Sequence, residues 1–361
     1  MAGAWRARLV LACAVTVAVA LAACGGESDD VAEPTEGPAR PFLMGFSSLP
    51  RELNAESYED AIDFTDDHGD IVLIQRTLPW EEFVPGGSVS DQTADNTASE
   101  RDAISDADLE LFFAIDVTDG ATGRDRLANL PVSLEGKTFA DAAVRAAFIS
   151  YAEYVALNYK PAYLALGVEM NLYYERNKDD FANFLSLYEE TYEVVKKQSP
   201  GTQITTTLQY EDLLGVMPRP DMHYPSWQVL RTLESHLDFV AISTYPSFAY
   251  ASVQALPANY YTQLQAFTEK PIVIAEMGFS SATANVNSGT ESEQSAFVRR
   301  ALADAESMSM PFVIWFAIWD PSYARDTAFS AFAHIGLRRE DDSEKPAWND
   351  WLAASRRPYG E

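Results

Sequence analysis

The sequence predicts a closed eight-stranded α/β barrel, a (β/α)₈ or TIM barrel, that forms a single domain over residues 41–361. Short apolar, β-branched or aromatic runs alternate with longer amphipathic segments, which is typical of repeated βα units on a parallel sheet. There are eight runs of each kind in strict alternation, which favours a closed barrel over an open sheet. Runs such as FVAIS and PIVIAE are almost continuously hydrophobic, as expected for strands buried on both faces.

The predicted strands are the apolar runs, in chain order: Phe42–Ser47, Ile71–Arg76, Leu109–Val117, Tyr163–Asn171, Gln203–Tyr210, Phe239–Tyr245, Pro271–Phe279 and Pro311–Trp319. The predicted helices are the amphipathic segments that follow them: Ala55–Asp67, Ser99–Asp106, Phe139–Asn158, Asp180–Gln198, Tyr224–Ser235, Ala258–Thr268, Glu291–Ser307 and Pro346–Ala354. Val84–Ala98 combines glycine with several Asp, Ser and Thr residues. It is therefore expected to be an irregular loop over the mouth of the barrel.

The composition excludes some classes of partner. The 361 residues include 26 Lys and Arg against 54 Asp and Glu, a net charge of −28. A surface this acidic repels phosphate backbones and anionic lipids, so we expect neither nucleic-acid binding nor membrane docking through basic patches. Apart from that, the charge has the simple interpretation that it keeps the protein soluble.

The N-terminus predicts an export signal over residues 1–23. Arg6 and Arg8 precede the apolar run Leu9–Ala20, which is too short to span a bilayer. The next four residues are Leu-Ala-Ala-Cys, at positions 21–24. This tetrapeptide resembles the lipobox of bacterial lipoproteins. The resemblance implies cleavage before Cys24 and lipidation of its thiol. Residues 24–40 then form the lipidated cysteine and a flexible acidic tether.

The expected location is the bacterial cell envelope, with the exported protein anchored to a membrane by lipid. Cys13 lies within the signal, so no disulfide is expected in the mature chain. The alternative is an ordinary secretory cleavage that leaves Cys24 as a free thiol.

A barrel fold places its functional residues at the carboxyl ends of the strands. The polar and aromatic residues at those ends are Gln75, Arg76, Asp116, Glu169, Asn171, Gln209–Glu211, Ser243, Tyr245, Glu276, Trp315, Trp319 and Asp320. None of the four histidines, His68, His223, His236 and His334, lies at a strand end, and neither HxH nor HExxH occurs, so no metal is predicted. There is also no GxSxG motif, and the sequence predicts no cofactor.

Two carboxylates are left as candidates for catalysis. Glu169 and Glu276 each lie late in an apolar strand, where a charge is costly unless it faces the barrel mouth. Strands four and seven lie on nearly opposite sides of the barrel, so the two side chains could flank one bond of a ligand. Retaining glycoside hydrolysis requires such a pair. The alternative is that both are structural residues in ion pairs, with Arg76 as a candidate partner.

This arrangement resembles the clan A glycoside hydrolases. Within that clan, the sequences of the strands are similar to those of the family 53 endo-β-1,4-galactanases. The resemblance implies that Glu169 is the acid/base and Glu276 the nucleophile. It also implies that Tyr245 orients the nucleophile and Trp315 lies under the sugar. Arg76 would steady the charge of the nucleophile.

One position departs from the clan A pattern. The residue before the acid/base is usually Asn, which binds the sugar 2-hydroxyl, and here it is Val168. If the strand continues, Asn171 lies on the same face as Glu169 and could take this role. Without that contact, several kcal/mol of transition-state binding through the 2-hydroxyl would be missing.

Aromatic residues favour a sugar ligand, because sugar rings stack on aromatic faces. The aromatic residues at or after the strand ends are Tyr173, Tyr174, Tyr210, Tyr224, Trp227, Tyr250, Trp319 and Tyr323. As a set they favour a groove for an oligo- or polysaccharide, with Tyr210 and Trp319 among the substrate-binding residues. Two alternatives to a hydrolase are a catalytically inactive barrel lipoprotein that binds or presents glycans, and a barrel that contacts other proteins at the envelope.

Overall fold

A computed structural model describes residues 37–219, 224–284 and 288–360. The predicted signal peptide, Cys24 and most of the predicted tether lie outside the described residues, as does His223. The barrel belongs to the compact unit formed by residues 35–361. Within the described ranges, no helix combines the length and the apolar character needed to cross a membrane.

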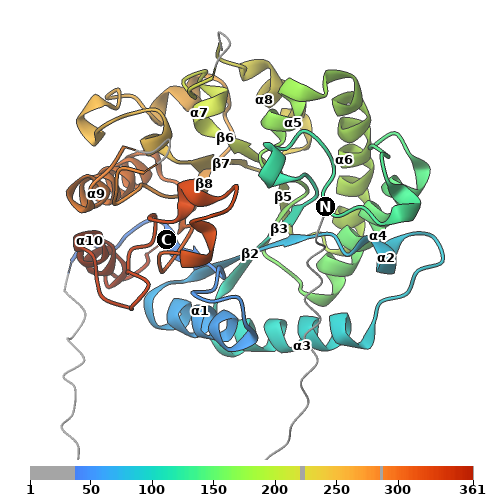
Figure 1. The fold of residues 1–361 in the computed structure, drawn as a ribbon, viewed down its shortest axis with the longest axis horizontal. Helices are drawn as coiled ribbons and strands as arrows, with labels where there is room; N and C mark the ends of the chain where they lie inside the picture. The colour runs from blue at the N-terminus through green and yellow to red at the C-terminus, as the bar shows by residue number, and fades with distance from the viewer. Residues whose placement is uncertain (1–36, 220–223, 285–287, 361) are drawn as a thin grey trace, which may run out of the picture. The chain divides into compact units, whose positions relative to one another are not determined.

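The predicted barrel is confirmed: within the described ranges, nine parallel strands form one sheet in the order β5-β4-β3-β2-β1-β9-β8-β7-β6 (Figure 1). The strands are β1 (Leu43–Ser47), β2 (Ile71–Thr77), β3 (Glu110–Asp116), β4 (Tyr163–Ala165), β5 (Gln203–Thr205), β6 (Thr207–Gln209), β7 (Val240–Thr244), β8 (Ile272–Met277) and β9 (Phe312–Trp315). The fifth predicted strand is therefore two short strands separated by Thr206. Because β5 and β6 are the two ends of the sheet order and are consecutive in the chain, the ring is nearly closed.

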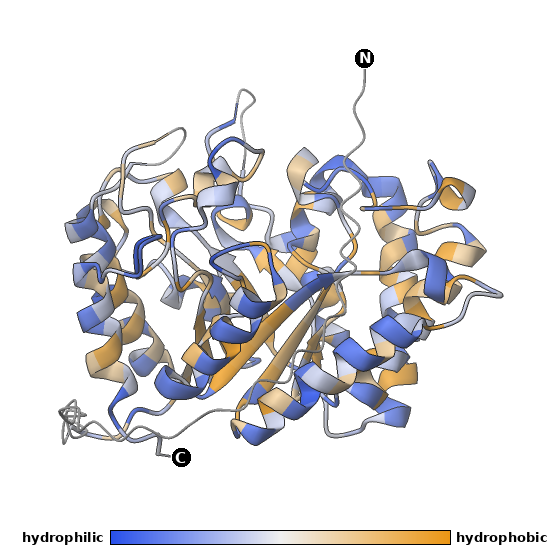
Figure 2. Cartoon of the chain, turned by 60° about the horizontal axis from the view of Figure 1, so that its bottom comes forward, coloured by the Kyte–Doolittle hydropathy of each residue, from blue (hydrophilic) through white to orange (hydrophobic). Residues whose placement is uncertain are grey.

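Helices surround the strands, with their apolar residues toward the sheet and their hydrophilic residues outward (Figure 2). They are α1 (Ala55–His68), α2 (Trp80–Phe83), α3 (Asp91–Asp106), α4 (Ala142–Asn158), α5 (Met170–Arg176), α6 (Lys178–Gln198), α7 (Tyr210–Leu213), α8 (Trp227–Leu233), α9 (Glu291–Met308) and α10 (Pro346–Ser355). Side chains cap several N-termini; Asn54, for example, accepts the Ser57 N–H at 2.8 Å.

Two predicted segments between the strands differ from the structure. The expected loop Val84–Ala98 becomes helical at Asp91, where Ser90 caps α3 by accepting the Thr93 N–H at 3.2 Å. The sequence did not predict this part of the helix because it contains few of the apolar residues, spaced at helical intervals, that indicate a buried face. The predicted helix Ala258–Thr268 is instead a 3₁₀ turn over Thr262–Ala266.

The amino-terminal end of the barrel is plugged by aromatic side chains. Phe112, Phe239 and Phe312 are fully or almost fully buried inside the ring, with ring centroids 5.6 to 6.4 Å apart. Tyr163 at the start of β4 packs against two of them. Each of these residues lies at or near the beginning of its strand. A ligand can therefore reach the interior only from the carboxyl ends of the strands.

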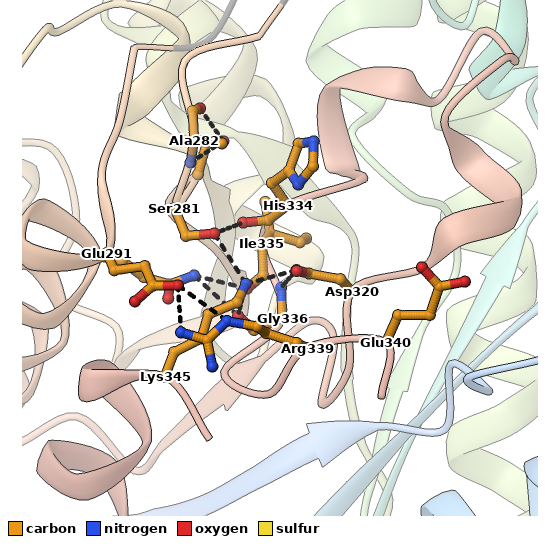
Figure 3. Close-up of polar contacts among 12 residues, drawn as sticks. Ser281, Ala282, Glu291, Asp320, His334, Ile335, Gly336, Arg339, Glu340 and Lys345 are labelled. Atoms are coloured by element: carbon orange, nitrogen blue, oxygen red, sulfur yellow. Dashed lines mark hydrogen bonds and ion pairs between the residues drawn. The ribbon is translucent and has the colours of Figure 1, made fainter. Parts of the chain in front are cut away.

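A buried lysine connects the last two strand loops to the final helix (Figure 3). Lys345 directly precedes α10, and its Nζ donates to Ser281 Oγ at 2.9 Å, Asp320 Oδ1 at 2.7 Å and the Gly336 carbonyl at 2.8 Å. Burial lowers the pKa of Lys345 and raises the pKa of Asp320, even though each group favours the charge of the other. The cost of burying the pair therefore exceeds their mutual attraction.

Candidate active site

A cavity of about 520 Å³ opens at the carboxyl ends of the strands. Its lining includes Glu169 and Glu276, together with Tyr245, Gln75 and Asp116. The structure therefore brings the two predicted carboxylates to one cavity from opposite parts of the sheet order.

A sharp bend in the backbone places Glu169. Strand β4 ends at Ala165, and Glu169 is the residue directly before α5, with φ 50° and ψ 45°. This left-handed conformation costs a residue other than glycine about 1–3 kcal/mol and is concentrated at functional sites. The Glu169 N–H donates to Thr207 Oγ1 at 2.8 Å, which helps to hold the bend. The prediction that this strand runs on to Asn171 is therefore wrong.

Both carboxylate oxygens of Glu169 accept hydrogen bonds. Arg124 Nε donates to Oε2 at 2.8 Å, and Ser243 Oγ donates to Oε1 at 2.6 Å. Arg124, which is 6% exposed, also donates from Nη1 to Asp116 Oδ1 at 2.6 Å. Gln75 in turn donates to the other oxygen of Asp116 at 3.0 Å. A buried arginine is thus shared by two carboxylates. Burial acts to lower the pKa of Arg124, but the two carboxylates raise it above its usual value.

Glu276 has the opposite environment. It is the fifth residue of β8 and 4% exposed; Tyr245 Oη donates to its Oε2 at 3.0 Å. Its Oε1 is buried and has no hydrogen-bond partner among the described residues. Burial, followed by repulsion from Glu169, raises the pKa of Glu276 to about 8, although Arg124 and the Tyr245 hydrogen bond act to lower it. Two ionised carboxylates are therefore disfavoured in this cavity at neutral pH.

Tyr245 is held by a buried carboxylate behind it. The Tyr245 N–H donates to Glu211 Oε2 at 3.0 Å. Glu211 is fully buried and also accepts hydrogen bonds from Thr244 at 2.6 Å, Tyr260 at 2.7 Å and Gln209 at 2.6 Å. Burial raises the pKa of Glu211. This residue fixes the start of the loop after β7, and with it the hydroxyl that contacts Glu276.

Arg76 does not reach the cavity, contrary to the prediction. It binds Glu100 through both terminal nitrogens at 2.7 and 3.0 Å and Tyr159 at 2.9 Å. The preceding residue, Gln75, lines the cavity instead. Successive residues of a strand face opposite sides, so an error of one position exchanges the inner face for the outer one.

Trp315 fails as the sugar platform for the same reason. It is fully buried, packs against Phe297 and Trp351 of the outer helices, and donates from Nε1 to the Ile335 carbonyl at 2.9 Å. The next residue, Phe316, lines the cavity. The aromatic side chain that this strand end contributes to the cavity is therefore Phe316.

Three further predicted substrate-binding residues lie away from the cavity. Asn171 is fully buried; it donates to the Gln209 carbonyl at 3.0 Å and accepts the Gln209 N–H at 2.7 Å. Tyr210 donates to the Tyr260 carbonyl, and Trp319 donates to Asp342 Oδ1 at 2.6 Å. Of the eight aromatic residues expected to form a groove, all within the described part of the chain, Tyr323 lines the cavity.

Sequence reasoning missed Arg124. It lies in the irregular segment after β3, has a positive φ of 65° and belongs to no periodic pattern. Its only signal in the sequence is a basic residue after a strand end in a strongly acidic chain. Across the described ranges, no group of three or more His, Cys, Asp or Glu residues could hold a metal ion.

No family model and no curated protein matches the sequence. Solved structures do match the fold. A GH5_18 variant from Bifidobacterium longum subsp. longum, in complex with Manβ1-4GlcNAc, has a TM-score of 0.66 at 16% identity, covering 88% of this chain and 80% of that one. The exo-β-1,4-mannosidase Op5Man5 from an Opitutaceae bacterium has a TM-score of 0.66 at 14% identity, over 92% and 62%. A family 39 glycoside hydrolase from Bacteroides cellulosilyticus has a TM-score of 0.58 at 18% identity, over 88% and 64%.

The chain has the barrel fold of these glycoside hydrolases. At such low identity the likeness concerns the fold, because one barrel fold hosts many chemistries.

Proposed function

We propose that the protein is a retaining glycoside hydrolase that uses Glu169 and Glu276. The observation that carries the proposal is that both carboxyl groups line one cavity, where burial and repulsion from Glu169 raise the pKa of Glu276 to about 8. A retaining mechanism requires one ionised and one protonated carboxyl group on either side of the scissile bond. The cavity lining favours an oligosaccharide or a smaller glycoside, since the aromatic residues expected to form a long groove lie elsewhere.

In the proposed mechanism Glu276 is the nucleophile and Glu169 the acid/base. The Glu276 carboxylate attacks the anomeric carbon while Glu169 gives its proton to the leaving oxygen, and the glycosidic bond breaks. Glu169, now a carboxylate, takes a proton from water, and the oxygen of that water displaces Glu276 from the sugar. Arg124 and Ser243 stabilise the charge that Glu169 acquires in the first step, and Tyr245 stabilises the charge on Glu276.

The pH dependence of activity follows from the proton that the pair shares. Turnover requires this proton, whichever carboxyl group holds it, so kcat/KM is expected to fall as the pH rises through about 8. Arg124 lowers the pKa of Glu276, so Arg124→Met should move this alkaline limb upward, on the order of one pH unit. Arg126→Met is the matched control, because Arg126 is exposed in the same loop. An alkaline limb that stays in place in Arg124→Met would contradict the assignment.

The decisive experiment incubates purified protein with a panel of oligosaccharides, polysaccharides and simple glycosides and measures released sugar. We expect hydrolysis that both Glu169→Gln and Glu276→Gln abolish, and product with the anomeric configuration of the substrate. Binding of a glycan that is never cleaved, and is unaffected by either substitution, would instead identify an inactive glycan-binding barrel.

We also propose that the protein is exported to the cell envelope and anchored through a lipidated Cys24. The support is the basic, apolar and small-residue pattern of residues 1–24. In a bacterial host the full-length protein should sediment with membranes, and Cys24→Ala should remove it from them. Equal membrane fractions for the two proteins would refute the anchor.

A further inference from the structure

The cavity that holds Glu169 and Glu276 has two chemically different sides. Polar side chains come from β2 and β3 and the segment after β3; they include Gln75, Asp116 and Arg124. The segments after β1 and β9 instead supply what we call the apolar wall: Leu49, Leu53, Phe316, Tyr323, Phe329 and Phe332. Strands β1 and β9 are neighbours in the sheet, so these residues form one side of the cavity.

Fixed contacts hold the apolar wall in place. The Tyr323 hydroxyl donates to the Pro50 carbonyl at 3.0 Å, which joins the two segments. Phe316 and Phe332 pack against each other with centroids 6.0 Å apart, and against the Tyr245 ring at 6.1 and 5.0 Å. The wall is therefore built on the side chain that orients Glu276.

The outer part of the apolar wall is open to solvent. Leu53 is 70% exposed and Phe329 is 45% exposed. Of the described residues after β1 and β9 that line the cavity, none is charged. An exposed apolar surface that continues into a polar site is typical of a place where a ligand binds. Burial of this surface is favourable when the group that covers it is uncharged and apolar, because apolar surface is then removed from water on both sides.

Two of the segments that line the cavity lie close together. A methyl group added at Gly120 would lie 3.3 Å from Phe329 Cε1, so the segments after β3 and β9 approach each other here. Both residues line the cavity. This approach leaves less room for an extended polysaccharide chain than for a compact group.

We propose that the substrate is a glycoside of an apolar alcohol. Its sugar would lie between the two carboxyl groups and its aryl or alkyl aglycone against the apolar wall. This inference rests on the hydrolase function proposed above and narrows its substrate class. Burial of each CH₂ group contributes roughly 0.8 kcal/mol, about fourfold in affinity.

The test compares methyl, octyl and 2-phenylethyl glycosides of the sugar that the panel identifies, alongside its disaccharide. The three alcohols are all primary and unactivated, so differences in kcat/KM report binding of the aglycone. We expect the octyl or phenylethyl glycoside to exceed the methyl glycoside at least tenfold. Leu53→Ser and Phe329→Ser should each lower that ratio several-fold. Val132→Ser should not, because Val132 is 89% exposed outside the cavity lining.

A preference for the octyl glycoside identifies a flexible chain and a preference for the phenylethyl glycoside a flat ring; either supports the proposal. Equal rates for all three, or preference for the disaccharide that Phe329→Ser leaves intact, would overturn it while the hydrolase function stands. If the protein shows no hydrolase activity, calorimetry still tests the apolar wall. It compares octyl and methyl 1-thio-β-glucosides and 1-thio-β-mannosides, whose sulfur linkage resists cleavage. Tighter octyl binding that Phe329→Ser weakens supports the wall as an apolar site; equal binding overturns it.

Discussion

Glu276→Gln is expected to lower kcat/KM on the order of 10⁴-fold, the largest effect on activity that the structure predicts. The amide cannot attack the anomeric carbon, yet it retains nearly the shape of the carboxyl group and is uncharged in a site where burial disfavours a charge. Circular dichroism and kcat/KM on the best glycoside measure the effect. A loss of less than tenfold with intact fold would remove Glu276 from the mechanism.

Azide distinguishes the roles of the two carboxyl groups. In Glu276→Ala, azide should attack the sugar from the face that the nucleophile has vacated and give a glycosyl azide of inverted configuration. In Glu169→Ala, it should attack the glycosyl–enzyme and give net retention. The reverse pattern would assign the nucleophile to Glu169, which Arg124 and Ser243 already hold through both oxygens.

The same Glu276 variant carries a stability prediction that does not depend on substrate. Glu276 has a pKa of about 8 in the folded protein, against roughly 4.3 in an unfolded chain. Between these values the folded state binds more protons, so the free energy of unfolding falls as the pH rises to about 8 and then levels off. Glu276→Gln lacks this loss and should gain stability relative to the parent between pH 5 and pH 9. Identical changes in Tm for the two proteins would contradict the raised pKa.

Lys345→Met should lower the free energy of unfolding by about 3–5 kcal/mol, the largest effect on stability. Lys345 is 1% exposed, and its removal leaves the Asp320 carboxylate buried without its cation. Lys137→Met is the matched control: Lys137 forms a half-exposed pair with Asp141, for which less than about 1 kcal/mol is expected. Urea denaturation followed by fluorescence measures both.

A double variant tests why Lys345→Met is costly. In Lys345→Met/Asp320→Asn the stranded charge is gone, while the Asn oxygen can still accept the Gly336 N–H that Asp320 now accepts at 3.0 Å. Burial raises the pKa of Asp320 and lowers the pKa of Lys345, so both shifts favour the neutral forms. The uncharged double variant should therefore recover most of the lost stability. A double variant as unstable as Lys345→Met would show that the bonds to Ser281 and Gly336 dominate instead.

The barrel and the pair of glutamates could be predicted from sequence, because both follow from burial. A parallel strand covered on both faces must be apolar along its length, so a lone carboxylate late in such a run, as in VIAEMGF, stands out. Tyr245 and Glu276 meet as the resemblance implied, at 3.0 Å.

The rest of the site depends on details that an apolar run does not encode. In IQRT, at residues 74–77, and IWFA, at residues 314–317, two neighbouring residues are equally good candidates for the inner face. In the structure, Gln75 and Phe316 line the cavity. Strand β4 ends at Ala165, and the left-handed turn at Glu169 that follows is held by a hydrogen bond to Thr207, 38 residues further along the chain. Arg124 comes from an irregular segment, where no periodicity points to a partner.

The pairing of the first and last strands has a consequence for the order of biosynthesis. Strand β1 pairs with β9, and the Phe46 ring packs against Trp348 and Trp351 of α10, with centroids 6.4 and 5.3 Å away. The ribosome makes Phe46 near the start of this domain and Trp351 only after the other strands. Domains fold as units during synthesis at about 5–20 residues per second, so the barrel of a nascent chain cannot close until the ribosome has made β9 and α10.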